Sequence, residues 1–229
     1  MEHPFLFFVK FFELIGLGHF AHAYPHVIYS WVTIAILIIV GAIGTKSISL
    51  IPNKFQNVLE LAVSGLEEFM VDITGDEGRW FFPLIGTIFL YIFLCNIMGL
   101  IPGFFPATAN LNTTLSCAIV VFLFTHIIGI RYHGIKYIKH FTGPIWWMIP
   151  IILPIEVIGH FARVLSLSFR LFGNLMGHEL VLTILFFLAG AFFAPLPIMV
   201  LGILVALIQA FIFYMLSTMY FTEAMEHSH

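Results

Sequence analysis

Residues 155–188 decide the fold, and they read IEVIGHFARVLSLSFRLFGNLMGHELVLTILFFL. The run is almost wholly apolar, and its only charged side chains are Glu156, Arg163, Arg170 and Glu179. Such a run predicts a helix that crosses a membrane. Arginine keeps its charge at every biological pH, and holding it at bilayer depth costs at least ~2.5–3.5 kcal/mol. Arg170, in the middle of the run, is therefore the first candidate for the working residue.

The composition places the whole chain in a bilayer. Hydrophobic residues make up 61% of the sequence, charged residues 9%, and the mean hydropathy is +1.06. A soluble domain usually carries roughly 25% charged residues, so we expect one polytopic membrane domain over residues 1–229. The formal net charge of −3 does not suggest nucleic acid as a partner. Cys95 and Cys117 lie in separate apolar runs and are expected to be plain core residues.

Apolar runs bounded by turn or charged residues predict an all-α fold with about five membrane-crossing helices. The expected crossings are residues 27–44, 80–101, 112–130, 155–188 and 197–222. Residues 52–74 carry apolar side chains at helical spacing with acidic residues between them, which predicts an amphipathic helix at the membrane surface. At about 1.5 Å per residue the 155–188 run would extend about 51 Å, against a hydrocarbon core of ~30 Å. The last two helices are therefore expected to form a steeply tilted hairpin along a large partner.

The basic residues predict the orientation. Two loops carry most of them: Lys46, Lys54 and Arg79 in one, Arg131, Lys136 and Lys139 in the other. The positive-inside bias assigns both loops to the cytoplasm. The N-terminal segment 1–26 is then periplasmic, and five crossings return the C-terminus to the cytoplasm.

A helical wheel gathers the unusual residues of the 155–188 run on one face. At about 100° per residue, Arg163 lies about 20° from Arg170, and Glu156 and Asn174 each lie about 40° away. Small or hydroxyl residues flank this face, namely Gly159, Ala162, Ser166, Gly173 and Gly177. The last helix has Gln209 and a matching small strip of Gly202, Ala206 and Ala210. Small residues allow close helix approach in membranes, but two arginines on one face favour a functional role over simple helix packing.

Glu179 and Glu156 are candidates for proton paths on opposite sides of the membrane. Glu179 falls about 180° from Arg170 on the wheel and His178 about 80° away, so they suit a path that approaches from another direction. Glu156 is several turns away toward the other membrane face. Plain structural satisfaction of both acids is the alternative interpretation.

Other kinds of site find little support. His178-Glu179 could open a zinc-binding HExxH motif, but position 182 is leucine. The in-membrane histidines show no convincing paired spacing for haem, and phosphate loops, CxxC pairs and nucleophile elbows are absent from the sequence. We expect no metal, no cofactor and no catalytic activity of the chain on its own.

The run Leu165-Ser-Leu-Ser-Phe-Arg-Leu-Phe-Gly-Asn-Leu-Met-Gly-His-Glu179 closely resembles the signature of subunit a of the F-type rotary ATP synthase. Three other stretches agree with it, namely Asn96-Ile-Met-Gly-Leu-Ile-Pro-Gly103, Thr108-Ala-Asn-Leu-Asn-Thr-Thr-Leu115 and Leu207-Ile-Gln-Ala-Phe-Ile-Phe213. The resemblance covers essentially the whole chain, and its Arg-Leu-Phe-Gly-Asn core is highly specific.

The resemblance implies a stator subunit in the bacterial inner membrane. Its two long helices would curve around the ring of c subunits, with subunit b and the rest of the synthase as further partners and no small-molecule substrate besides the ion. Protons would pass through two offset half-channels, coupling ion flow to rotation and ATP synthesis.

The resemblance also implies roles for individual residues. Arg170 matches the essential stator arginine and Asn174 the asparagine one turn later. Glu179 matches an acid of the periplasmic inlet, Glu156 an acid of the cytoplasmic outlet, and Gln209 a polar partner of the arginine. Ser166 is assigned to the same proton path. Some members pair the inlet acid with a histidine on the last helix, where this chain has Gly202; we hypothesise that His178 takes that part.

Three other interpretations remain at this stage. The first is a secondary transporter or channel with an intramembrane arginine gate, which predicts internal repeats that the sequence does not show. The second is an intramembrane enzyme or haem protein, and the third is a structural scaffold. The choice between proton and sodium is open, because the ion site would lie on the ring.

Overall fold

The computed structural model describes residues 6–14, 16, 18–46, 53–101, 103–134, 137, 149–189 and 195–226. Regular structure in these ranges is entirely helical. The longer helices are α3 (Pro25–Thr45), α4 (Lys54–Thr74), α5 (Phe82–Met98), α6 (Leu111–His133), α8 (Ile149–Ala189) and α9 (Pro195–Glu226). Short helices α1 (Phe7–Leu14) and α2 (Gly18–Ala23) come first, and the 3₁₀ turns η1 (Asp76–Phe81) and η2 (Ala107–Ala109) flank α5.

The fold class predicted from the sequence is confirmed. Within the described ranges, five helical segments are long and apolar enough to cross a membrane, so the chain is an all-α polytopic membrane protein. α4 is not among these five, and it occupies the stretch 52–74 for which the sequence predicts an amphipathic helix. α8 begins at Ile149 rather than Ile155, because Pro154 lies inside the helix without ending it. Membrane helices tolerate such a proline when their neighbours satisfy the freed backbone groups.

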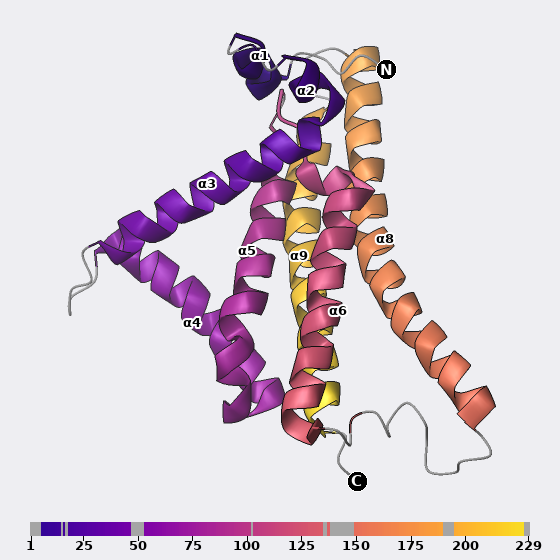
Figure 1. Cartoon of the computed structure of the whole chain (residues 1–229). Coiled ribbons are helices and arrows are strands. Elements are labelled where there is room, and N and C mark those ends of the chain that lie inside the picture. The colour runs from indigo at the N-terminus through magenta and orange to yellow at the C-terminus, as the bar shows by residue number, and fades with distance from the viewer. Residues whose placement is uncertain are drawn as a thin grey trace.

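The helices form a central bundle with two outlying arms (Figure 1). α5 packs along α9, and α6 packs along both α8 and α9. α3 leaves the bundle at a steep inclination and α4 returns to it, so that the two enclose an open wedge (Figure 1). The N-terminal half of α8 leans outward, away from the bundle (Figure 1). α8 therefore has a bundle side and a side without contacts in the described chain.

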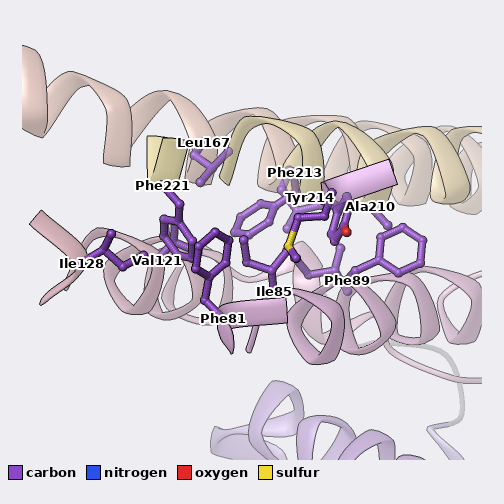
Figure 2. Packing of buried hydrophobic residues seen from close by; sticks show 14 of the residues in the cluster. Phe81, Ile85, Phe89, Val121, Ile128, Leu167, Ala210, Phe213, Tyr214 and Phe221 are labelled. Carbon is purple, nitrogen blue, oxygen red and sulfur yellow. The ribbon is translucent and has the colours of Figure 1, made fainter. Parts of the chain in front are cut away.

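Aromatic and branched side chains fill the centre of the bundle (Figure 2). They come from η1, α5, α6, α8 and α9, and the labelled ones include Phe81, Ile85, Phe89, Val121, Leu167, Tyr214 and Phe221. Lipid tails are as apolar as these residues, so helix association in a membrane depends on close packing and on hydrogen bonds between helices. One such bond joins the hydroxyls of Thr114 on α6 and Ser168 on α8 at 3.0 Å, with both side chains buried.

α4 is anchored to α9 by its C-terminal half. The Tyr214 hydroxyl donates to the Leu66 carbonyl oxygen at 2.6 Å, and Phe69 packs on the Tyr214 ring. The N-terminal half of α4 leaves Phe55 and Val58 exposed. The described chain thus covers only the C-terminal end of the apolar stripe predicted for residues 52–74.

The loop after α5 is held by the N-terminal helices. Gly103 has φ +90°, a conformation that glycine adopts without strain. Its carbonyl oxygen accepts from the Tyr29 hydroxyl at 3.1 Å and from the Phe7 backbone N–H at 3.2 Å. These bonds fix the end of α5 at which Asn96 and the start of α6 are found.

Candidate functional site

Arg170 lies on the side of α8 that faces away from the bundle. Leu167, Leu171 and Leu175, four residues apart, are buried against the other helices. Arg170 and Asn174, by contrast, are exposed. Within the part of the chain that the structure describes, the Arg170 guanidinium forms no hydrogen bond or ion pair. A charge presented in this way at bilayer depth calls for a partner, which here must come from outside the described chain.

The surface around Arg170 is flat and open. Ser166, Gly173 and Gly177 are all exposed on α8, and a methyl group added at either glycine would meet nothing within 4 Å. Because these glycines have no neighbours in the described chain, they do not serve packing between its helices. They allow a second helix to approach the arginine closely.

The small strip on α9 faces elsewhere. Ala206 and Ala210 are 1% and 0% exposed, and the Asn96 amide of α5 donates to the Ala206 carbonyl oxygen at 3.3 Å. The strip on α9 resembles the one on α8 in its small residues, but the two do not pack against each other. One strip packs inside the bundle, and the other faces outward.

His178 and Gly202 meet directly. A Cβ at Gly202 would lie 2.6 Å from His178 Cε1 and Nε2 and 2.5 Å from Leu100 Cδ2. The imidazole therefore occupies the space that a side chain at position 202 would need. The His178 Nε2–H donates to the Ile198 carbonyl oxygen at 3.1 Å, which anchors the ring on α9.

The other polar residues in this half of the molecule form fewer contacts with one another. Glu179 is half-buried beside His178, and Gln209 is half-buried on α9. No hydrogen bond joins Gln209 to Arg170 in the described structure. Asn96 is 1% exposed, and its side-chain oxygen accepts from the Thr108 hydroxyl at 2.8 Å. Asn96 appears in the sequence only as part of a motif, and its polar type in an apolar run is the signal that could have marked it.

Arg163 differs from Arg170. Its guanidinium donates to both carboxylate oxygens of Glu223 on α9, at 2.6 and 2.8 Å, and lies 5.3 Å from the centre of the Tyr220 ring. Two-pronged arginine–carboxylate pairs are strong and geometrically specific. Arg163 thus shares a helix face with Arg170 in the sequence, but in the structure it holds α8 to the end of α9.

Glu156 belongs to a second cluster at the same end of α8 as Arg163. Its Oε1 lies 3.5 Å from His160 Nε2, and the His160 ring lies 5.2 Å from that of His126 on α6. The Tyr137 hydroxyl is 2.8 Å from His126 Nδ1. Burial, followed by the nearby Glu156 and Glu223 carboxylates, raises the pKa of Tyr137, so the phenol stays neutral and can donate. No group of three or more His, Cys, Asp or Glu in the described ranges has the arrangement of a metal site.

Comparison with known proteins gives the same family that the motif suggested. The family model described as ATP synthase A chain matches residues 27–222. The chain belongs to this family. It is 66% identical to the ATP synthase subunit a of Desulfosudis oleivorans, 53% identical to that of Syntrophobacter fumaroxidans and 51% identical to that of Geotalea daltonii, each over 100% of both chains.

The family match covers most of the candidate site. The match spans all the polar residues described above that lie on α5, α6 and α8, together with most of α9. It supports a role in ATP synthesis and proton transport by a chain with several transmembrane helices. The contribution of each side chain to that transport is a separate question.

Proposed function

We propose that this chain is the ion-translocating stator subunit of the membrane sector of a rotary ATP synthase. Protons would pass through two offset half-channels, to and from carboxylates on a ring of c subunits, and Arg170 would separate the two. The observation that supports this most directly is that Arg170 is exposed on the outer face of α8, has no partner among the described residues, and is followed by the open Gly173 and Gly177. Subunit b and the rest of the synthase would complete the assembly.

The physics of the arginine accounts for proton release. A fixed positive charge within ~4–6 Å stabilises an ionised carboxylate by ~1–4 kcal/mol. A ring carboxylate that passes Arg170 would therefore give up its proton toward the outlet. Once past the arginine it must be reprotonated before it faces lipid, because a bare charge there is expensive. The membrane potential supplies ~2.3 kcal/mol per charge per 100 mV.

The inlet and the outlet fall at opposite ends of α8. His178 and Glu179 would form the inlet on the periplasmic side, and His178 fills the space above Gly202 where some family members carry a histidine. Asn174, Gln209 and Ser166 would line the path near Arg170. Glu156 would belong to the outlet on the cytoplasmic side, which the basic loops assign to the end that carries the C-terminus.

Replacing Arg170 tests the proposal. Arg170→Ala in the intact synthase should abolish ATP-driven proton pumping in inverted membrane vesicles, while the complex still assembles. Arg79→Ala is a matched control, since its side chain is 62% exposed at the surface and bonds only loosely to Glu67 and Asp76 among the described residues. Normal pumping by Arg170→Ala would contradict the proposed role. Proton flux through the purified chain alone in liposomes would instead favour a channel.

A further inference from the structure

A histidine pair lies where the C-terminal half of α6 meets the first turns of α8, away from Arg170. The rings of His126 and His160 are 5.2 Å apart, and both pack edge-on against Phe122. Glu156 Oε1 is 3.5 Å from His160 Nε2, and Tyr137 is bonded to His126. Imidazole is the side chain whose charge changes nearest to neutral pH, so two of them beside a carboxylate form a group that can hold a proton.

The backbone is shaped to hold Tyr137 in this cluster. The Tyr137 ring lies directly on α6 at Gly129, where any Cβ would collide with it, and Tyr137 is 8% exposed. The Tyr137 hydroxyl and His126 Nδ1 are 2.8 Å apart, and either of the two can donate. This hydrogen bond holds the His126 ring in one orientation.

The charges around the pair allow one extra proton. Among the described residues, the groups that face it are His126 from α6, Tyr137 after α6, Glu156, His160 and Arg163 from α8, and Tyr220 and Glu223 from α9. The Glu156 carboxylate stabilises an imidazolium at His160. Two imidazoliums at this distance would repel each other, and Arg163 is neutralised by Glu223. The cluster therefore favours a single proton on the His160 side.

A cavity beside His160 has room for a water molecule. A cavity of about 20 Å³ lies between α6, α8 and α9, and His160, Arg163, Tyr220 and Thr125 are among its lining residues. A water needs roughly 10–15 Å³ by this measure and two to four polar partners. The cavity is large and polar enough for one water beside His160.

We propose that the His126–His160 pair is a proton-holding station on the outlet side, between the level of Arg170 on α8 and the more exposed Glu156, an inference that rests on the proposed function. In synthesis, water in the cavity passes a proton to His160 Nε2, the imidazolium passes it to a Glu156 carboxylate oxygen, and the Glu156 carboxyl group then releases it to the solvent. In ATP-driven pumping the transfers run in reverse. No bond other than those to the proton changes, and no further reactant is required.

The test is ATP-driven pumping by the intact synthase in inverted vesicles between about pH 6 and pH 9. His160→Gln should pump at nearly the normal rate at low pH and about 10-fold more slowly at high pH, because proton capture from water limits the rate when protons are scarce. Imidazole added to the outer solution should restore the rate. His133→Gln is the matched control, since His133 lies at the same end of α6 and bonds only the Ala224 carbonyl oxygen at 3.1 Å among described partners.

Two further measurements keep the outcome decisive. If His160→Gln fails to assemble, Tyr137→Phe removes only the hydroxyl that orients His126 and should show the same trend with pH at a smaller size. A pH profile equal to that of His133→Gln, or a defect that imidazole does not relieve, would overturn the station. Arg170→Ala in the same preparation separates the two proposals, because its normal pumping would count against the proposed function itself.

Discussion

Adding one methyl group at Gly202 should impair proton uptake through His178. The new Cβ of Gly202→Ala would lie 2.5–2.6 Å from Leu100 Cδ2 and the His178 ring, well inside contact distance. Overpacking of this kind costs about 1–3 kcal/mol, and relief requires the ring to move away from the Ile198 carbonyl oxygen, a bond worth about 0.5–1.5 kcal/mol. A helical alanine regains about 0.5–1 kcal/mol over glycine. The net penalty is about 1–3 kcal/mol, or about a 5- to 150-fold loss if all of it falls on proton transfer.

The assay is ATP-driven acidification of inverted vesicles, scored beside the amount of assembled synthase. Gly65→Ala is the matched control, because a methyl group at that helical glycine of α4 meets nothing within 4 Å. It should pump normally. The difference between the two variants then measures the crowding of His178 rather than a general effect of replacing glycine.

A double-mutant cycle identifies the partner. In a His178→Ala background the ring is gone, so Gly202→Ala should cost much less than in the native chain, apart from the contact with Leu100. The expected coupling between the two positions is about 1–2 kcal/mol. Equal effects of Gly202→Ala in both backgrounds, or wild-type pumping by the single variant, would refute the packing of His178 on Gly202.

Three other variants test separate contacts. Glu179→Gln should slow proton uptake at least about 10-fold with normal assembly, and wild-type flux in reconstituted vesicles would contradict that role. Glu223→Gln should destabilise the complex by about 1 kcal/mol, measured as an earlier onset of heat aggregation. The effect is modest because the side chains of Arg163 and Glu223 are 35% and 41% exposed, so that solvent screens the pair. Thr114→Val should lower the unfolding free energy by about 1–3 kcal/mol by leaving the buried Ser168 hydroxyl without its cross-helix bond, whereas Thr114→Ser should retain most of the stability.

The sequence predicts those features that depend on one helix at a time. Apolar length places α3, α5, α6, α8 and α9 within a few residues of the expected crossings, and a wheel drawn from Arg170 brings Asn174, Gly173 and Gly177 to the same exposed face. Contacts between helices depend on how each one is rotated, which the period of a single helix does not contain. The Arg163–Glu223 pair, 60 positions apart, could not be predicted for that reason.

The same limit applies to the small residues and the histidines. The sequence contains both strips of small residues but does not say what each one faces, and the structure turns the α9 strip toward Asn96 of α5. His126 and His160 meet only because α6 and α8 pack side by side. The contact of His178 with Gly202 also joins two helices. The family resemblance linked these positions only through the hypothesis that His178 takes the part of a last-helix histidine.

The contrast between the two arginines of α8 bears on function more than either alone. Both sit on one helix seven positions apart, so both carry the same desolvation penalty in principle. Arg163 offsets it through two bonds to Glu223 near the end of α9. Arg170 has no such partner in the described chain and stands beside glycines that leave room for another helix. A fold that neutralises one arginine internally leaves the other without a partner among the described residues. Under the proposed function, that free energy would be recovered when a ring carboxylate comes past it.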